Sequence, residues 1–432
     1  MVCLGTQLNQ LKLVSLIIVL VSILSACVPP RLEIQPPNGP PDPPTEPDFD
    51  LSGRQLPELL LAPAGSSPAH PASAALSDAL ADMLGGDYAA AADRLADLLN
   101  RLEPGDERRV TADLLGETLF LLGDWDRFLH YAQYYSAGLY DDRVLAQTFM
   151  GQAPFRAVIP TESVTLPLNA SPIGTPALLV SVNGRNSRFW LDTGAGLTVL
   201  TESTARRCGI VPAEPKTTAD TTTRHKVAVR GAIIRELRAG GVVFRNLPAI
   251  VLSDRDLRLP GPLGHPVSLD GLIGWNALRH LAVDLDLATG CCRLGPSRPI
   301  TGSRRNLFWL GYPCANAAMA DGRPLVFGLD TGAAATSLRQ PFLEKLGARS
   351  LPRRRTKIAG AGGIESREVQ FVPRLTVSLG GQTLIWRDLA IWPVSGYALT
   401  PLDGVLGADV LAVARLELDP GAGRLILHPR LR

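Results

Sequence analysis

Two aspartates in this chain of 432 residues lie in nearly identical surroundings, 138 positions apart. The shared motif is Asp192-Thr193-Gly194-Ala195 in the first segment and Asp330-Thr331-Gly332-Ala333 in the second. An apolar stretch precedes each motif, which predicts a strand that ends in a tight turn carrying the carboxylate. Two carboxylates that a fold holds close together cannot both ionise, so they share one proton. Such a pair can take a proton from water and give one to a leaving group.

A second pair of matching segments lies downstream of the two aspartates. Leu272-Ile273-Gly274 follows the first aspartate, and Val405-Leu406-Gly407 follows the second. Because both motifs recur in the same order, the chain holds two copies of one unit, at residues 160–298 and 303–432. Short β-rich runs separated by Gly and Pro fill both copies, which predicts an all-β architecture for this region.

The repeated pattern resembles the half-domain of aspartic peptidases, in which apolar-apolar-Asp-Thr-Gly-Ala is followed by apolar-apolar-Gly. Retroviral peptidases form as a homodimer of such halves, and pepsin-like enzymes fuse two halves in one chain. Residues 160–432 are similar to two retropepsin-type halves fused in tandem. The resemblance implies a mainly β fold with a bilobal, pseudo-twofold unit, preceded here by a small helical domain. It also implies an endopeptidase with Asp192 and Asp330 as the catalytic pair and with no metal, cofactor or covalent intermediate.

The resemblance gives roles to the residues around the catalytic pair. By this resemblance, we expect the hydroxyls of Thr193 and Thr331 to hydrogen-bond across the pseudo-twofold axis and to lock the two loops together. The glycine after each threonine allows backbone torsions and a close approach that a side chain would forbid. The strands that end at Gly274 and Gly407 pack under the two loops and fix them.

Ala195 and Ala333 stand where many pepsin-like enzymes have Ser or Thr. An alanine has no hydroxyl to stabilise the ionised carboxylate, and the retroviral enzymes share this feature. We therefore expect a mildly acidic optimum, at about pH 5 to 6.

A glycine-rich segment downstream of the second aspartate matches the flap, a β-hairpin that covers the substrate in this family. Its glycines are Gly360, Gly362 and Gly363, and apolar residues bracket them, which suits a mobile hairpin tip. The equivalent stretch of the first copy is polar and includes Arg224 and His225. We therefore expect one working flap rather than two.

The N-terminal residues resemble the signal of a bacterial lipoprotein. Residues 13–24 form an apolar run that is too short to span a bilayer but suits a secretory signal. The run ends in Leu24-Ser25-Ala26-Cys27, which is similar to a lipobox. This implies that residues 1–26 are a signal peptide and that lipidated Cys27 anchors the protein in the bacterial cell envelope, on the periplasmic side of the outer membrane. The alternative is an ordinary cleaved signal without a lipid.

Two segments separate this signal from the β region. Residues 27–70 are rich in Pro, Gly, Asp and Glu, so we expect a disordered tether that holds the folded part off a membrane. Residues 71–152 are rich in Ala and have apolar residues at helical spacing, which predicts a small helical domain. Gly86-Asp87-Tyr88 and Gly123-Asp124-Trp125 recur within it, similar to a tetratricopeptide-type array. An irregular helical domain is the alternative, and either one offers a surface for a protein partner.

The composition disfavours several other classes of function. The formal net charge is +2, from 43 basic and 41 acidic residues, and gives no electrostatic footprint for nucleic acid. The six histidines and the cysteines show no metal-ligand spacing, so we expect no metal site. An envelope location would permit disulfides, but the sequence does not determine their pairing. The cysteines outside the N-terminal segment are Cys208, Cys291, Cys292 and Cys314.

Two other kinds of function fit the same sequence. A lipid-anchored binding protein could hold peptides in a degenerate peptidase cleft without cutting them. A helical scaffold protein could use the β region only to assemble complexes. Intact Asp, Thr and Gly in both copies favour the peptidase, although a fold alone does not establish an activity. The short junction between the copies favours pairing within one chain over pairing between chains.

Overall fold

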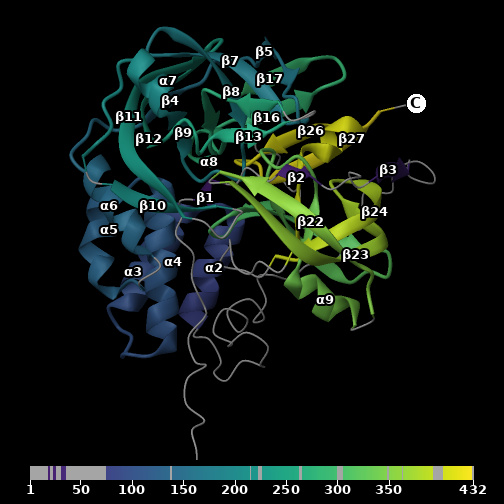
Figure 1. Ribbon diagram of the computed structural model, residues 1–432. Coiled ribbons are helices and arrows are strands. Elements are labelled where there is room, and N and C mark those ends of the chain that lie inside the picture. Colours follow the sequence, from purple (N-terminus) through teal and green to yellow (C-terminus); the bar gives the residue numbers. More distant parts are fainter. Residues whose placement is uncertain are drawn as a thin grey trace, which may run out of the picture.

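The computed structural model describes most of the chain from residue 74 onward and three short strands before it. The described ranges are 18–19, 23–25, 31–35, 74–136, 139–214, 216–221, 226–261, 265–298, 305–347, 350–361, 363–392 and 402–430. Cys27, Gly362, Arg224 and His225 lie outside these ranges, as do most of the predicted signal peptide and tether. Within the described residues, no helix combines the length and the apolar character needed to cross a membrane. The molecule is mainly β, with a layer of helices on one side (Figure 1).

The helical layer occupies the region predicted to be helical. It consists of α2 (Ala74–Gly85), α3 (Tyr88–Leu99), α4 (Asp106–Leu122), α5 (Trp125–Tyr131), η1 (Ala132–Tyr134) and α6 (Tyr140–Phe149). The recurring Gly-Asp-aromatic motif marks two helix junctions. Gly86 and Gly123 have positive φ and follow α2 and α4, and the side chains of Asp87 and Asp124 cap the next helix by accepting backbone N–H groups. Whether the layer is a tetratricopeptide-type array stays a prediction.

Within the described residues, the first half of the β region contains fourteen strands and two short helices. They are β4 (Arg156–Val158), β5 (Val164–Pro167), β6 (Asn169–Ala170), β7 (Pro176–Val182), β8 (Arg185–Leu191), β9 (Thr198–Thr201), α7 (Glu202–Arg207), β10 (Lys216–Thr221), β11 (Val227–Ala239), β12 (Val242–Leu252), β13 (Arg258–Pro260), β14 (Pro266–Ser268), β15 (Gly271–Ile273), α8 (Trp275–Leu278), β16 (Ala282–Asp286) and β17 (Cys291–Gly295).

The second half has its own set of strands and short helices, most of which correspond to elements of the first half. They are β18 (Leu307–Trp309), β19 (Pro313–Met319), β20 (Pro324–Leu329), β21 (Ser337–Arg339), α9 (Gln340–Leu346), β22 (Arg353–Gly360), β23 (Gly363–Leu379), β24 (Gln382–Trp392), β25 (Gly404–Leu406), η4 (Ala408–Ala412), β26 (Ala414–Asp419) and β27 (Arg424–Pro429).

The two halves have the same sheet order, which confirms the tandem β architecture. The first sheet runs β10-β11-β12-β9-β15-β8-β7-β6, and the second runs β22-β23-β24-β21-β25-β20-β19-β18. The additional pairing of β11 with β7 has its counterpart in β23 with β19. A separate five-stranded sheet, β27-β26-β16-β17-β5, takes strands from both halves. Because β16 pairs antiparallel with β26, this sheet joins the two halves into one body.

Part of the predicted tether is folded. β3 (Arg31–Gln35) pairs antiparallel with β24, as β4 pairs with β12 in the first half. Leu32 and Ile34 point to one side of this strand and pack against the core. The prediction of a disordered tether is therefore wrong at these five residues. Polar and apolar side chains alternate in Arg31–Gln35, so this short segment can pair as a strand with the edge of β24.

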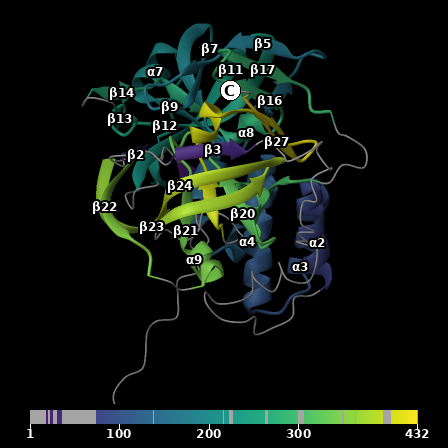
Figure 2. The same ribbon diagram turned by 90° about the vertical axis from the view of Figure 1, so that its right-hand side faces the viewer.

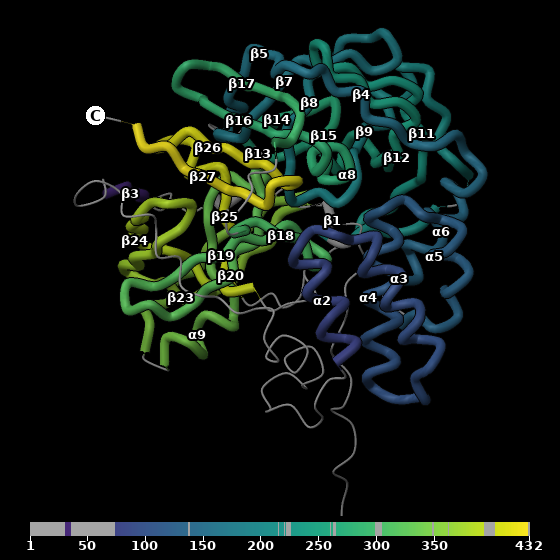
Figure 3. The backbone as a smooth tube through the Cα atoms, turned by 180° about the vertical axis from the view of Figure 1, so that it is seen from behind, coloured from purple at the N-terminus to yellow at the C-terminus, as the bar shows by residue number. Residues whose placement is uncertain are grey.

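The helical layer packs against both halves rather than standing apart from them. Helix α6 contacts β10 and β11 of the first half, and α2 contacts β18 of the second. Tyr88 of α3 and Trp309 of β18 form an edge-to-face ring pair with centroids 5.9 Å apart. Figure 3 shows the helices side by side next to both halves, seen from behind.

Candidate active site

The two Asp-Thr-Gly loops leave the ends of equivalent strands, β8 and β20. Parallel pairing of β15 with β8, and of β25 with β20, places a supporting strand beside each loop. The backbone N–H of Asp192 donates to the carbonyl of Ile273, and that of Asp330 donates to Leu406, each at 3.0 Å. The strands that end at Gly274 and Gly407 therefore hold the loops by backbone hydrogen bonds.

The threonines of the two loops are bonded across the interface between the halves. The N–H of Thr193 donates to the hydroxyl of Thr331 at 3.1 Å, and the N–H of Thr331 donates to the hydroxyl of Thr193 at 3.0 Å. The Thr331 hydroxyl also donates to the carbonyl of Leu191 at 2.6 Å. These reciprocal bonds tie the two loops into one unit within a single chain.

The glycines after the threonines are required by close approach and not by backbone torsion. Neither Gly194 nor Gly332 has a positive φ. A Cβ placed at Gly332 would lie 2.5 Å from Cγ of Asp192, and one at Gly194 would lie 2.7 Å from Cγ of Asp330. Each half therefore presents bare backbone to the carboxyl group of the other, which brings the two carboxyl groups together.

The two carboxyl groups are fully buried and share an environment that favours protons. Burial raises the pKa of Asp192, although N–H groups of Gly194 and Ala195 donate to its Oδ1 and favour its ionised form. Burial raises the pKa of Asp330 well above its ordinary value, and the charge of Asp192 raises it further. Asp330 receives the N–H of Ala333 at 2.8 Å. The arrangement favours one proton on the pair, which titrates as a unit.

The glycines of the supporting strands also permit close packing. A Cβ at Gly274 would lie 2.4 Å from the carbonyl carbon of Leu197, and one at Gly407 would lie 2.4 Å from that of Ala335. The supporting strands can therefore lie directly under the segments that follow the two catalytic loops.

A threonine after each loop completes this support. Thr198 donates its backbone N–H and its hydroxyl to Oδ1 of Asn276, at 2.9 and 3.0 Å. Thr336 donates the same two groups to Oδ1 of Asp409, at 2.9 and 2.6 Å. The geometry is repeated in both halves, but an amide in the first half is replaced by a carboxyl group in the second.

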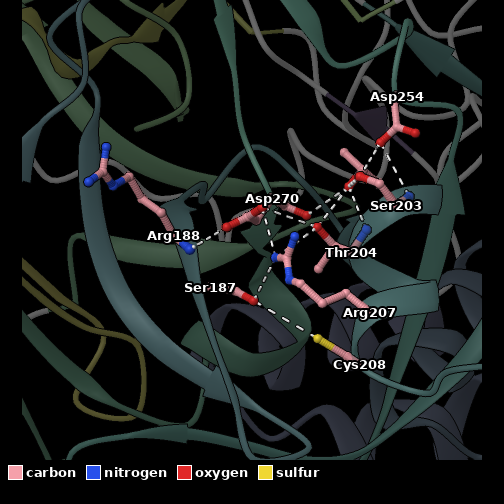
Figure 4. Close-up of polar contacts among 9 residues, drawn as sticks. Ser187, Arg188, Ser203, Thr204, Arg207, Cys208, Asp254 and Asp270 are labelled. Atoms are coloured by element: carbon pink, nitrogen blue, oxygen red, sulfur yellow. Dashed lines mark hydrogen bonds and ion pairs between the residues drawn. The ribbon is translucent and has the colours of Figure 1, made fainter.

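A second pair of aspartates, Asp270 and Asp403, holds the supporting strands by hydrogen bonds and ion pairs. From the sequence, neither was assigned a role. Asp270 accepts the backbone N–H of Arg188 at 2.8 Å and forms an ion pair with Arg207 at 2.9 Å (Figure 4). In the second half, Asp403 accepts the N–H of Val326 at 2.8 Å and the ammonium group of Lys345 at 2.7 Å.

The signal for these braces was present in the sequence. In each copy the aspartate lies two residues before the repeated apolar-apolar-Gly segment, with one glycine between them. Arg207 and Lys345 occupy equivalent positions in the two copies, and both are basic. Because an aspartate and a basic residue recur at equivalent positions in both copies, a comparison of the copies could have predicted the ion pairs Arg207–Asp270 and Lys345–Asp403.

The predicted flap is a long hairpin formed by β22 and β23 (Figure 2). The pairing extends to Gly360 opposite Gly363, and Gly363 has a φ of 131°, which suits glycine. The side chain of Ala359 next to the tip is fully buried. The first half has a hairpin at the equivalent place, β10 and β11, so hairpins are present at both positions.

The first hairpin is held by the helical layer through Asp141 of α6. Its carboxylate accepts hydrogen bonds from the hydroxyl of Thr217, from the N–H and hydroxyl of Thr218 at 3.0 and 2.9 Å, and from Lys226 at 3.1 Å. Burial opposes ionisation of Asp141, but these donors hold its pKa below the ordinary value. At the same hairpin, a Cβ at Gly231 would lie 2.8 Å from Thr148 of α6, so the helix lies directly on β11.

Two short N-terminal strands lie along the two hairpins. β1 (Ile18–Val19) pairs in parallel with β10, and β2 (Ile23–Ser25) pairs antiparallel with Lys357–Ala359 of β22. Both strands belong to the predicted signal peptide. Their pairing demonstrates that the edges of both hairpins can accept an extended polypeptide through backbone hydrogen bonds.

The helical layer also reaches the first catalytic loop. A cavity of about 20 Å³ lies between this loop, the turn before β19 and the end of α4. Its lining includes Thr193 and Gly194 of the loop, Tyr312 of the turn, and Phe120 and Leu121 of α4. A space of this size holds about one water molecule.

Other reactive side chains do not gather at this site. In the part of the chain that the structure describes, no group of three or more His, Cys, Asp or Glu side chains is arranged to hold a metal ion. The four cysteines Cys208, Cys291, Cys292 and Cys314 are not joined in disulfides, and all but Cys291 are buried.

A family model described as aspartyl protease matches the chain twice, at residues 178–277 and 316–410. Each match contains one Asp-Thr-Gly motif and the glycine that ends its supporting strand. The two matches fall in the two halves of the β region that share a sheet order. This agreement supports the equivalence of the two Asp-Thr-Gly loops.

Among solved structures, the chain is similar to a retropepsin-like aspartic protease from Rickettsia conorii. The sequence identity is 17%, over 34% of this chain and 96% of that chain, and the TM-score of 0.22 is too low to bear on the fold. A search of curated proteins found no match. The chain is thus similar to aspartyl proteases in both halves of its β region, which consists of two halves in tandem with the same sheet order.

Proposed function

We propose that this protein is an aspartic endopeptidase in which Asp192 and Asp330 activate one water molecule. The observation that carries the proposal is the reciprocal packing of each carboxyl group against the bare glycine of the opposite loop. Two equivalent loops, bonded through Thr193 and Thr331, form one site within a single chain. The family match in both halves supports aspartic protease activity.

The chemistry follows from the single proton that the pair retains. The ionised carboxylate takes a proton from water, and the resulting nucleophile attacks the scissile carbonyl carbon. The protonated carboxyl group donates to the carbonyl oxygen, and proton transfer to the amine then releases the product. The two groups titrate as a unit, so the macroscopic pKa values belong to the pair.

A polypeptide substrate fits the surroundings of this pair. The edges of β10 and β22 already accept extended backbone from β1 and β2. A substrate that pairs with the same edges would lie extended beside the catalytic loops, and backbone hydrogen bonds would hold it with little dependence on sequence. Side-chain preferences would then depend on cavities next to the loops.

We also propose attachment to a membrane of the bacterial cell envelope through a lipid on Cys27. The support is the sequence from Leu24 to Cys27, which resembles a lipobox. Because β3 begins at Arg31, an anchor at Cys27 would hold the catalytic body close to the membrane. A protein partner on the helical layer is a further part of this proposal, and the outer face of that layer is the surface it would use.

The proposal is tested by cleavage of an unstructured protein by residues 28–432, which retain β3. Asp192→Asn and Asp330→Asn should each abolish cleavage, and a statine-type inhibitor should block it. Asp97→Asn is the matched control, because Asp97 is exposed on α3. A folded but inert wild type that still binds peptide would favour the binding protein with a degenerate cleft.

A further inference from the structure

Tyr312 lies in the turn between β18 and β19, directly beside the strand that leads to Asp330. β19 pairs antiparallel with β20, with Cys314 opposite Gly328. A Cβ at Gly328 would lie 2.8 Å from Cε1 of Tyr312, so the ring lies on the bare backbone of β20. The Tyr312 side chain is 2% exposed, which fixes it in the interior next to the catalytic pair.

The hydroxyl of Tyr312 points to the place where the two loops meet. It lies 2.7 Å from the position that a Cβ of Gly194 would take, and Cγ of Asp330 lies at the same distance from that position. The hydroxyl has no hydrogen-bond partner within the described residues. Buried polar groups are nearly always paired, so a buried hydroxyl without a partner beside the two carboxyl groups needs an explanation.

The first half does not repeat this arrangement. Gly311-Tyr312-Pro313 corresponds to Gly174-Thr175-Pro176, and Gly328 corresponds to Trp190. The hydroxyl of Thr175 is satisfied by Ser171, at 2.6 Å. The second half thus has glycine on the strand where the first has Trp190, and it has Tyr312 on the turn where the first has Thr175. Of the two turns, the one with Tyr312 carries the unpaired hydroxyl.

We propose that Tyr312 is a catalytic residue that donates a hydrogen bond to the scissile carbonyl oxygen as the tetrahedral intermediate forms. The proposal rests on the peptidase function proposed above. A donor that meets charge developing in the transition state accelerates the reaction, because the interaction is stronger there than in the ground state. The cavity of about 20 Å³ next to Tyr312 and Gly194 leaves room for one small polar group beside the hydroxyl.

The hydroxyl stays a donor at every working pH. Burial raises the pKa of Tyr312 well above its ordinary value, and the neighbouring charges of Asp330 and Asp192 raise it further. The group therefore does not compete with the carboxyl groups for the role of base. Its removal should lower the rate without displacing the acidic or basic limb of the pH profile.

The test is Tyr312→Phe, which keeps the ring and removes the hydroxyl. The matched control is Tyr135→Phe, because Tyr135 is also buried with an unpaired hydroxyl but lies in the helical layer. We expect kcat to fall by about 10²-fold in Tyr312→Phe with little change in KM, and to stay near the wild-type value in Tyr135→Phe. Equal kcat values for Tyr312→Phe and the wild type would overturn the proposal.

A binding measurement separates this inference from the peptidase function. A statine-type inhibitor carries a hydroxyl in place of the tetrahedral oxygen, and calorimetry measures its affinity without turnover. We expect Tyr312→Phe to weaken its binding by about 10-fold relative to Tyr135→Phe. Weakened binding in a chain that cuts no peptide would sink the peptidase function while supporting the role of the hydroxyl. Unchanged affinity would count against the hydroxyl whatever the activity, and 3-fluorotyrosine at position 312, which retains it, should restore binding.

Discussion

The two halves of the β region are alike where they meet and different where they face the rest of the molecule. Both have the same sheet order, the same bonded loops and the same brace formed by an aspartate and a basic residue. Each hairpin pairs with a short N-terminal strand, β10 with β1 and β22 with β2, but the hairpin β10–β11 is in addition held by Asp141 of α6. The turn that faces each loop also differs, with Thr175 in one half and Tyr312 in the other.

The difference separates two physical requirements. The two carboxyl groups share one proton, so each Asp-Thr-Gly loop must bring its carboxyl group close to that of the other loop. Nothing in that requirement constrains the hairpins and turns around the loops. These elements can diverge, and each can then take on a separate task in substrate binding or in transition-state stabilisation.

The largest expected effect tests the similarity of the two halves. Gly194→Ala and Gly332→Ala each place a methyl group less than 3 Å from the opposite carboxyl group. We expect both variants to lose activity by about 10²-fold or more, because a displacement of roughly 1 Å misaligns the catalytic pair.

The comparison is made by measuring kcat/KM for each variant against Gly105→Ala. Gly105 has no heavy atom within 4 Å of the position that the added methyl group would take, so its variant should behave like the wild type. A large loss in only one of the two loop variants would mean that the loops are not equivalent in function.

The pH dependence sharpens the comparison between the two carboxyl groups. Burial raises the pKa of both carboxyl groups, and the charge of Asp192 raises that of Asp330 further, so the two groups titrate as one pair that retains a proton to higher pH than an isolated carboxyl group does. The pair is active with one proton, and activity is lost when the remaining proton leaves. We therefore expect kcat/KM to rise as the first proton leaves the pair and to fall by about 10-fold per pH unit beyond the second ionisation. A profile that peaks below about pH 4 would contradict the buried, proton-sharing pair.

A smaller effect tests the difference between the two hairpins. Asp141→Ala removes the acceptor that joins α6 to Thr217, Thr218 and Lys226. We expect the hairpin β10–β11 to exchange its amide hydrogens faster and KM to rise about 3-fold, with kcat nearly unchanged, because the loss of positioning weakens substrate binding in the ground state.

Two controls accompany this variant. Asp126→Ala changes an exposed aspartate on α5 and should alter neither quantity. Asp141→Asn retains one acceptor oxygen and should restore part of the protection. Unchanged hydrogen exchange of β10 in Asp141→Ala would mean that α6 does not fix the first hairpin.

Local motifs were sufficient to predict the centre of the molecule. A repeated motif of about ten residues contains Asp192 and Gly194 in one copy and Asp330 and Gly332 in the other. The structure brings the two copies of this motif together. The reason for the glycines was only partly predicted, because neither has an unusual torsion and the constraint comes from the opposite half. The flap hairpin was predicted from Gly360 and Gly363 because tight turns leave a compositional trace.

The features missed by the sequence analysis depend on contacts between distant segments. Arg31–Gln35 looks like tether because a five-residue strand needs the edge of β24 to form. Asp141 looks like an ordinary helix residue until the fold places Thr217 beside it. Tyr312 looks like an ordinary turn residue in the sequence, because only the fold places its unpaired hydroxyl near Asp330. The charge pair of Asp270 and Arg207 could have been found by comparing the two copies.

The most direct test of the account is the cleavage of an unstructured protein by residues 28–432 and by two single variants. The account predicts that Asp192→Asn and Asp330→Asn each lower kcat/KM by about 10³-fold or more, while both variants keep the wild-type melting temperature to within a few degrees. Retention of activity in either variant would contradict the shared catalytic pair, and would mean that one half acts without the other.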